Sequence, residues 1–449
     1  MTVQSLVNSQ FHMPTTQTRV VITGLGVVSP LGRDLRAFWD CLIRGVSGIT
    51  EFSELPLDVL PVRHGGQAKC FTGAIEDFGQ LDKNLQRAIK KNQKVMCREI
   101  ELGVAACQLA LSHADLGVDD RDPERTGITY GCDYLLTRPE EFADGIEACH
   151  DASRAFHREQ WPILGMPKVN PLWLLKFLPN MPASHVAIFN DLRGPSNSLT
   201  VREASNALTI GEATAAIRRG VADAMIVGAT GSRIEPLRFL HVTNQEQIAR
   251  DRPNPAEMSR PFDAGRDGIV LGEGAGAFVL ESLEHAQKRG ATIYAEVIAT
   301  GASAVGAAAG RDHIRMATKN VLSGIVGKAR EALADGWHLH ASGRGDVSMD
   351  ISESLGIHDV LGENKSVPIV AAKSYFGSLG AGSAAVEVIS SCLAMINDEL
   401  FSTLNCSEPD PRCPIRVSTK PADPGKAFIH LAYSPQGQTS GVCIAKFSN

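Results

Sequence analysis

Short runs of β-branched and apolar residues alternate along the chain with longer segments in which apolar residues recur every three or four positions. The first run, 19–28, is interrupted only by Gly24 and Gly26 and ends at a Ser-Pro-Leu-Gly turn, which predicts a buried strand entering a loop. Residues 97–112 have helical spacing, and residues 125–131 have the pattern of the next strand. This alternation predicts an α/β fold.

A similar succession of elements occurs twice, without a repeat at the level of individual residues. In the first half, apolar runs at 186–190 and 224–227 predict strands on either side of a helix over 203–219 that stops at Gly220. In the second half we expect strands near 276–280, 293–298, 367–371, 427–432 and 441–447, and helices near 283–288, 312–335 and 379–397. We therefore expect the chain to divide into an N-terminal half, 18–257, and a C-terminal half, 258–449.

Residues 134–182 fit neither half. The segment contains Trp161, Trp173 and further large apolar residues. We interpret it as an insertion that covers a site or a dimer interface.

Composition narrows the classes of partner. Of 449 residues, 43% are hydrophobic, and 44 Lys and Arg against 50 Asp and Glu give a formal charge of -6, so no overall basic field attracts nucleic acid or an anionic membrane. The ten cysteines form no CxxC pair, which predicts reduced and mostly buried thiols and a cytoplasmic protein. Residues 1–17 lack the pattern of a signal peptide, and no apolar run approaches the ~18 residues that span a bilayer.

Several segments, in order along nearly the whole chain, resemble the thiolase-fold condensing enzymes, in particular the β-ketoacyl-acyl carrier protein synthase II type and its chain-length-factor relatives. The most specific of them is SRPFDAGRDGIVLGEGAGAFVLE at 259–281. The others are RVVITGLGVVSPLG at 19–32, RGVSGI at 44–49, LPNMPASHVAIFNDLRGPSNS at 178–198, SGRGDVSMDISE at 342–353, AAKSYFGSLGAG at 371–382 and LNCSEPDP at 404–411.

The resemblance implies a five-layer αβαβα sandwich made of two similar halves, and a dimer formed through the strand just before the catalytic helix. It also implies an acyl carrier protein as partner and a site built from one Cys at a helix N-terminus, two His and one Lys. In such a site the helix dipole stabilises the thiolate, which takes an acyl group from a thioester, and the two imidazoles stabilise the enolate formed as carbon dioxide leaves.

Three of these four residues are replaced. In GPSNSLTVREASNA, Glu203 stands where the resemblance places the Cys. Ser342 replaces the first His, with Asp350 and Glu353 still in register, and Ser378 replaces the second, while Lys373 is retained. The motifs are anchored on both sides of each replacement, so we expect neither a nucleophilic sulfur nor either imidazole in this site.

Other positions of the expected acyl pocket have changed as well. The paired threonines that would bind the pantetheine arm become Arg344 and Asp346, and the gating loop becomes 434–438, with Gln436 at its centre. This predicts an altered or closed acyl pocket. Glu273 in the GEGAG motif is expected to fix a loop through hydrogen bonds.

Glu203 is expected at a helix N-terminus, where the dipole favours a carboxylate by roughly 0.3–1 kcal/mol. Burial has the opposite effect on a carboxyl group. If Lys373 lies close enough to pair with it, Glu203 is ionised and structural; for Lys373 itself, a buried ion pair with Glu353 is the second possibility. A carboxylate can attack a thioester, but without an imidazole the resulting anhydride has no evident route to a carbon–carbon bond.

Two further signals are weaker. The GLG and GEGAG glycines do not form a GxGxxG fingerprint, and no His spacing suggests a metal site, so we expect neither a nucleotide, nor a metal, nor another cofactor. Basic residues cluster before Met96. The resemblance implies that they contact an acidic carrier protein, and an ordinary solvated helix face is the alternative explanation for the same pattern. They are Lys83, Arg87, Lys90, Lys91 and Lys94.

Three hypotheses follow. The first is a non-condensing, chain-length-factor-like subunit of fatty-acid or polyketide assembly, present as a homodimer or as a heterodimer with an active ketosynthase. The second is a malonyl-thioester decarboxylase or a thioester-processing acyltransferase that uses Glu203. The third is a homodimeric scaffold whose pocket has closed.

Overall fold

The computed structural model describes residues 18–53, 55, 57–58, 60–306, 312–362 and 366–448. The expectation for the polar N-terminal tail, 1–17, lies outside these residues. No helix within the described ranges is long and apolar enough to cross a bilayer.

The first half of the chain supplies five strands in the order β5-β4-β6-β7-β1. β4 pairs in parallel with β5 and β6, whereas β6 with β7 and β7 with β1 are antiparallel. The strands are β1 (Val20–Val28), β4 (Thr126–Cys132), β5 (Ser196–Leu199), β6 (Ala224–Ser232) and β7 (Glu273–Ser282). β7 lies beyond residue 257, so these five strands extend to Ser282.

The second half repeats this arrangement in the order β10-β9-β11-β12-β8, with the same parallel and antiparallel pairings. Its strands are β8 (Ala295–Ala304), β9 (Trp337–His340), β10 (Ile369–Val370), β11 (Ala427–Tyr433) and β12 (Gln438–Ala445). A short β1–β8 pairing joins the two sets into one ten-stranded sheet. The predicted α/β fold of two similarly ordered halves is confirmed.

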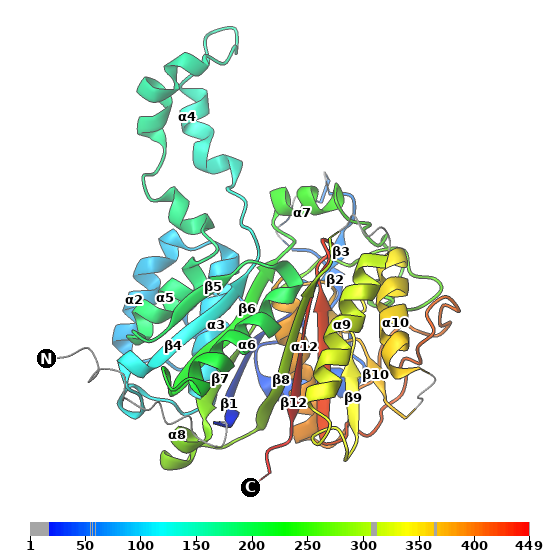
Figure 1. Ribbon diagram of the computed structural model, residues 1–449. Coiled ribbons are helices and arrows are strands. Elements are labelled where there is room, and N and C mark those ends of the chain that lie inside the picture. The colour runs from blue at the N-terminus through cyan, green and yellow to red at the C-terminus, as the bar shows by residue number, and fades with distance from the viewer. Residues whose placement is uncertain are drawn as a thin grey trace, which may run out of the picture.

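Helices complete the layers (Figure 1). α6 (Ser205–Arg218) and α12 (Gly382–Ile396) each contact strands of both halves and form the middle layer. α3 (Arg98–His113) packs on β1, β7 and β6, and α9 (His313–Lys328) packs on β8, β12 and β11. α5 (Met181–Asn190) lies against α3, and α10 (Val347–Leu361) against α9. α12 is buried along nearly its whole length, as a central layer requires.

Gly24 and Gly26 explain why β1 and α3 lie so close together. A Cβ at Gly24 would stand 2.4 Å from the carbonyl oxygen of Ala110, and one at Gly26 would stand 2.1 Å from that of Ala106. Both carbonyls belong to α3. These glycines therefore permit close helix–strand packing.

One predicted strand is wrong. Residues 186–190 belong to α5, which begins at Met181 with Pro182 in its first turn and ends at Asp191 in the left-handed conformation, φ 50°. A five-residue apolar run does not by itself distinguish a strand from a buried helix segment. The strand that follows is instead β5, whose sequence Ser-Asn-Ser-Leu is mostly polar because it lies at the edge of the sheet.

The remaining elements are short and lie around this core. They are α1 (Leu35–Ile43), β2 (Thr50–Glu51), β3 (His64–Gly65), α2 (Lys83–Asn92), α4 (Ala143–Glu147), α7 (Pro236–Thr243), α8 (Leu283–Lys288) and α11 (Lys373–Phe376).

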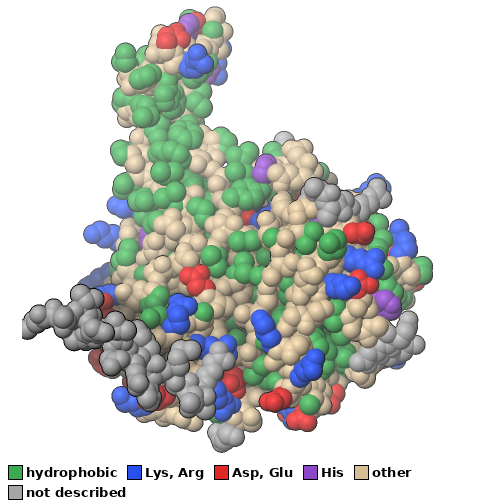
Figure 2. All heavy atoms as spheres, in the orientation of Figure 1, with side chains coloured by type: hydrophobic (Ala, Val, Ile, Leu, Met, Phe, Trp, Pro, Cys, Tyr) green, Lys and Arg blue, Asp and Glu red, His purple; other side chains and the backbone are tan. Residues whose placement is uncertain are grey.

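Residues 134–178, here named the arm, project from the layered body and carry α4 (Figure 1). Phe142 packs edge-on against Trp161 and Trp173 inside the arm. Its surface is nevertheless apolar along much of its length (Figure 2), with Ile163 76% and Met166 59% exposed. The arm therefore leaves an unusually apolar surface outside the main core.

Candidate functional site

A strained turn places Glu203 between β5 and α6. Arg202 has φ +51°, an unfavourable value for a non-glycine residue, and a single turn of 3₁₀ helix, Arg202–Ala204, leads into α6. Glu203 thus lies at the N-terminal end of α6, as predicted, and it is completely buried. The chain keeps the sharp elbow that presents a nucleophile in hydrolytic and condensing sites, but here the elbow presents a carboxylate.

Five charged side chains meet at this elbow, and we name them the charge cluster. Glu203 Oε1 lies 2.5 Å from Arg233 Nη2 and 3.4 Å from Arg344 Nη2. Glu246 binds the same two arginines and also Arg202, at 3.0 Å from Arg233 and 2.6 Å from Arg202. All five side chains are at least 90% buried. Three guanidinium and two carboxylate groups therefore fill the region around Glu203.

The cluster keeps Glu203 ionised. Burial raises the pKa of Glu203, but Arg233, Arg344 and Arg202 together outweigh burial, so the pKa lies below its ordinary value. Burial likewise raises the pKa of Glu246, and the same three guanidinium groups reverse the shift. Two carboxylates beside three cations are thus stable as anions.

Lys373 pairs neither with Glu203 nor with Glu353, the two partners considered from the sequence. Its ammonium binds Glu387, donates to the carbonyl oxygen of Ser342 at 3.0 Å, and lies 3.3 Å from Ser342 Oγ. Glu387 also contacts His430 Nε2 at 2.9 Å. The reason is geometric: Lys373 begins α11, and α12 presents Glu387 to it within the central layer.

Glu353 instead fixes the loop after β9. Its two oxygens accept hydrogen bonds from the backbone N–H groups of Ser342, at 2.7 Å, and Gly343, at 3.0 Å. Burial raises the pKa of Glu353 to about 8. Ser342 and Lys373 therefore meet in the structure, and Glu353 holds Ser342 in place through the backbone.

Ser378 lies on a different loop. Its N–H donates to Val270 at 2.7 Å and its carbonyl accepts from Gly272 at 3.0 Å, while Oγ is buried without a hydrogen-bond partner among the described residues. Neither serine exposes its hydroxyl to solvent. At the two positions where the resemblance places imidazoles, the chain therefore offers neutral hydroxyl groups.

The positions expected to bind pantetheine have other contacts. Arg344 belongs to the charge cluster, and its guanidinium lies 5.9 Å from the ring centre of Tyr433. Asp346 caps α10 by accepting from the N–H groups of Ser348 and Met349, both at 2.9 Å. Gln436 is exposed in the turn between β11 and β12.

The remaining candidates lie farther from the charge cluster. Glu273, at the start of β7, accepts hydrogen bonds from Arg98 and from the Ala68 N–H at 3.2 Å, and so holds the loop before α2. Lys90, Lys91 and Lys94 are exposed on α2 and the turn that follows, and form no ion pair within the described ranges. In the described part of the chain, no group of three or more His, Cys, Asp or Glu side chains is arranged to hold a metal ion.

Comparison with known proteins identifies the family. The family model "Beta-ketoacyl synthase, N-terminal domain" matches residues 17–286, and "Beta-ketoacyl synthase, C-terminal domain" matches residues 294–407. The chain belongs to the β-ketoacyl synthase family. Among its relatives is 3-oxoacyl-[acyl-carrier-protein] synthase 2 of Vibrio harveyi, 30% identical over 403 residues, which cover 88% of this chain and 90% of the relative. The Staphylococcus aureus (strain N315) protein of the same name is 30% identical over 406 residues, 89% and 91% of the two chains.

Solved structures of β-ketoacyl synthases share the fold. A β-ketoacyl synthase from Burkholderia phymatum STM815 superposes with a TM-score of 0.79 at 24% identity, and the ishigamide ketosynthase/chain length factor with a TM-score of 0.78 at 23% identity. Each alignment covers 96% of this chain and 100% of the other. The five-layer architecture is thus that of the β-ketoacyl synthases.

Sequence reasoning missed three members of the charge cluster in this β-ketoacyl synthase homologue: Arg202, which adjoins Glu203, and also Arg233 and Glu246. Arg233 directly follows β6, and Glu246 follows α7 (Pro236–Thr243), and neither lies in a family motif that we had identified. A buried carboxylate at position 203 does require a cationic partner. That requirement signals a partner, but a single sequence does not say which arginine supplies it.

Proposed function

We propose that this β-ketoacyl synthase homologue is a non-condensing subunit, similar to a chain-length factor, that pairs with an active ketosynthase in fatty-acid or polyketide assembly. The observation that carries this proposal is the charge cluster: an ionised, fully buried Glu203 occupies the elbow, held by Arg233 and Arg344. The chain then contributes shape and surface, and its partner contributes the chemistry.

The chemistry of condensation supports this view. Transfer of an acyl group needs a nucleophile that forms a thioester, and the release of carbon dioxide needs donors to the developing enolate. Removing one such donor costs roughly 10² to 10³ in rate. Here the elbow lacks sulfur, and serines stand at positions 342 and 378, where the resemblance places histidines.

A decarboxylase or acyltransferase that uses Glu203 is disfavoured. Two guanidinium groups lower the basicity and nucleophilicity of its carboxylate, and the side chain has no exposed surface. The filled surroundings of Glu203 agree equally well with a closed homodimeric scaffold, and the experiment below distinguishes that outcome.

Two features favour pairing with a similar chain. β5 lies at the edge of the sheet with Ser196 and Asn197 exposed, which leaves backbone groups available to continue the sheet. The apolar arm projects from the same half (Figures 1 and 2). One similar solved structure is, by its title, a ketosynthase/chain length factor.

An acyl carrier protein is the second proposed partner. Another similar structure, with a TM-score of 0.78 at 24% identity, is by its title a type II polyketide acyl-carrier protein in complex with its ketosynthase. The exposed Lys90, Lys91 and Lys94 present positive charge suited to an acidic carrier surface. A carrier-dependent pathway of this kind is consistent with a cytoplasmic protein.

The test is co-expression with a ketosynthase that has the Cys and both His and is encoded beside this chain. We expect a heterodimer by size-exclusion chromatography with light scattering. Incubation with malonyl-carrier protein and mass spectrometry should show elongated products only for the pair.

Glu203→Cys alone should form no ketoacyl product, because both imidazoles are still missing.

Three results would overturn the proposal. Ketoacyl product from the isolated chain, or carbon dioxide release that Glu203→Gln abolishes, would make it an enzyme. A stable homodimer that neither binds the ketosynthase nor changes its products would make it a scaffold.

A further inference from the structure

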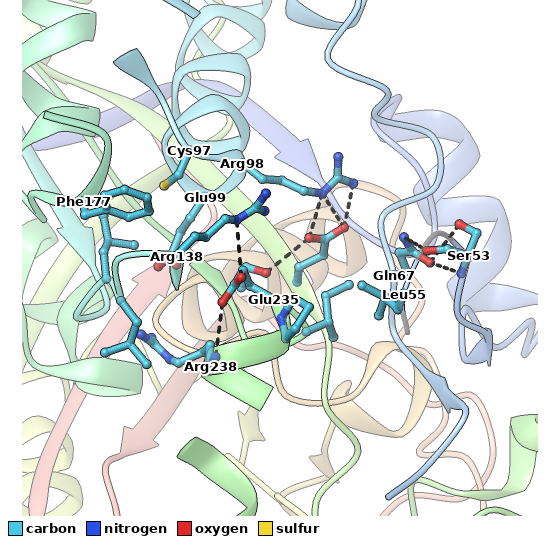
Figure 3. A pocket seen from close by; sticks show the side chains of 16 residues that line it. Ser53, Leu55, Gln67, Cys97, Arg98, Glu99, Arg138, Phe177, Glu235 and Arg238 are labelled. Carbon is cyan, nitrogen blue, oxygen red and sulfur yellow. Dashed lines mark hydrogen bonds and ion pairs between the residues drawn. The ribbon is translucent and has the colours of Figure 1, made fainter. Parts of the chain in front are cut away.

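A cavity of about 260 Å³ opens at the base of the arm, lined by different residues from those of the charge cluster (Figure 3). Its walls come from the start of α3, the loop from β6 to α7, the start of β7, the two ends of the arm, and Ser53, Leu55 and Gln67 near β2 and β3. Its ionisable lining consists of three arginines and three glutamates, Arg98, Arg138, Arg238, Glu99, Glu235 and Glu273.

Arg238 is the most deeply buried of the three arginines, with 3% of its surface exposed. It forms an ion pair with Asp133 at 2.9 Å and lies over the ring of Tyr134, 3.8 Å from the ring centre. Its Nε and Nη2 atoms have no aligned hydrogen-bond acceptor among the described residues. Nη2 faces Asp133, so Nε is the donor left unused, and a buried guanidinium with an unused donor beside a cavity is suited to an oxygen-rich group of a ligand.

The N-terminal end of α3 lies at the same cavity. Its N-cap residue, Cys97, makes no capping hydrogen bond through its side chain, and the helix dipole favours negative charge at this end. Glu99, in the first turn, does not supply that charge near neutral pH: burial raises the pKa of Glu99 to about 8. A protonated Glu99 is instead a further donor.

The acceptors around the cavity are already engaged. Glu273 accepts from Arg98, from Ser232 Oγ at 3.3 Å and from a backbone N–H. Glu235 pairs with Arg138 at 3.3 Å and accepts from the N–H of Arg238 at 3.2 Å. Unused donors therefore outnumber unused acceptors, which favours a ligand that carries acceptors and a negative charge.

Apart from Ser53, Gln67, Cys97 and Ser232, the rest of the lining is apolar. Leu135, Leu136 and Phe177 come from the two ends of the arm, and Ile234 and Pro236 come from the loop before α7. A ligand that matches both the donor-rich part and the apolar part of the lining has an anionic head and a compact apolar body.

We propose that this cavity is a binding site for a small free monocarboxylate, whose carboxylate group meets Arg238, Glu99 and the N-terminus of α3 and whose hydrocarbon part packs on Leu136, Phe177 and Ile234. The site is independent of Glu203 and of the function proposed above. No covalent step is involved.

The groups that face Glu99 allow a test by pH. They are Cys97 before it, Cys132 and Asp133 at the end of β4, and Arg238 on α7; Tyr134 and His241 lie beyond Arg238. Burial raises the pKa of Cys97 to about 12 and moves the pKa of Cys132 well above its ordinary value. Of Glu99, Cys97 and Cys132, Glu99 is therefore the group that ionises between pH 7 and 9.

The probe is sodium octanoate, measured by isothermal titration calorimetry on the full chain, with octanamide and octylamine as neutral and cationic controls. We expect octanoate to bind at least tenfold more tightly than either control at pH 7, and its affinity to fall as Glu99 ionises toward pH 9. Glu99→Gln keeps a donor and should make the affinity independent of pH over this range.

Leu136→Glu places a negative charge at the half-buried apolar end and should weaken octanoate binding at least tenfold. Val118→Glu, at a residue that is 68% exposed and not part of the lining, should leave binding unchanged. Three results would overturn the assignment: equal affinity for octanoate and octylamine, an affinity of the unmodified chain that does not change with pH, or no effect of Leu136→Glu.

Discussion

At the scale of single residues, Glu203 illustrates how a buried charge is tolerated. Moving an isolated carboxylate into the interior costs several kcal/mol, and only close, well-aligned cations offset that cost. Arg233 and Arg344 reach the same oxygen, and Glu246 neutralises part of their excess charge. The elbow is therefore stable with a carboxylate because several other residues supply the matching charges.

We predict that Glu203→Gln destabilises the fold by about 3–5 kcal/mol, because it leaves three buried guanidinium groups to share the single carboxylate of Glu246. Urea unfolding followed by circular dichroism measures the change. Glu212→Gln is the matched control: it makes the same substitution on an exposed part of α6 and should change stability by less than about 0.5 kcal/mol. Similar losses for the two variants would contradict the structural role assigned to Glu203.

At the scale of elements, the contact of β1 with α3 depends on the absence of side chains. Gly26→Ala would bring a Cβ to 2.1 Å from the Ala106 carbonyl, so helix and strand would have to separate. We predict a loss of more than about 2 kcal/mol, or failure to fold.

Gly324→Ala supplies the control for this substitution. Gly324 lies in α9 and is exposed, and a methyl group added there would have no atom within 4 Å, so alanine should stabilise the helix by roughly 0.5–1 kcal/mol. Thermal unfolding of both variants tests the contrast. Equal effects would show that the close approach of β1 to α3 does not matter for stability.

Long periodic elements were predictable from the sequence, and short or edge elements were not. The apolar runs of β1, β6 and β11 and the helices α3, α6, α8 and α12 were located to within a few residues. β5 was missed because its polar Ser-Asn-Ser segment has no strand pattern, and 186–190 was mistaken for it. β9, with four residues, was not located either, because a short buried element carries little periodicity, and α10 was missed although it is 15 residues long.

The candidate site was likewise predictable only in part from the sequence. Motif register located Glu203, Ser342, Lys373 and Ser378, but not their partners, since Lys373 binds Glu387 and Glu203 binds Arg233. Such pairings depend on how α12 and the loop after β6 pack in three dimensions. Local sequence carries no information about that packing.

At the scale of the whole molecule, we expect the arm to determine how the chain meets a partner. Ile163 and Met166 expose apolar surface far from the layered body, and this surface favours association with another chain. We predict that Ile163→Glu weakens dimer formation at least tenfold while the unfolding midpoint of the monomer stays within about 2 °C. Analytical ultracentrifugation and thermal unfolding measure the two quantities.

Val118→Glu serves again as the control, because it changes an exposed apolar residue outside the arm. Its dimerisation constant should equal that of the unmodified chain. If Ile163→Glu leaves dimerisation unchanged, the arm has no part in the interface.

The charge cluster also connects the two halves of the chain, since Arg344 comes from the second half and its four companions come from the first. This has an evolutionary consequence. A descendant regaining sulfur at the elbow would first have to lose guanidinium groups that now hold both repeats together, and each isolated reversion leaves an unbalanced charge in the interior. Under the proposed non-condensing role, the route from this arrangement back to a working catalyst therefore passes through intermediates with an unbalanced buried charge, which would make the loss of chemistry self-perpetuating.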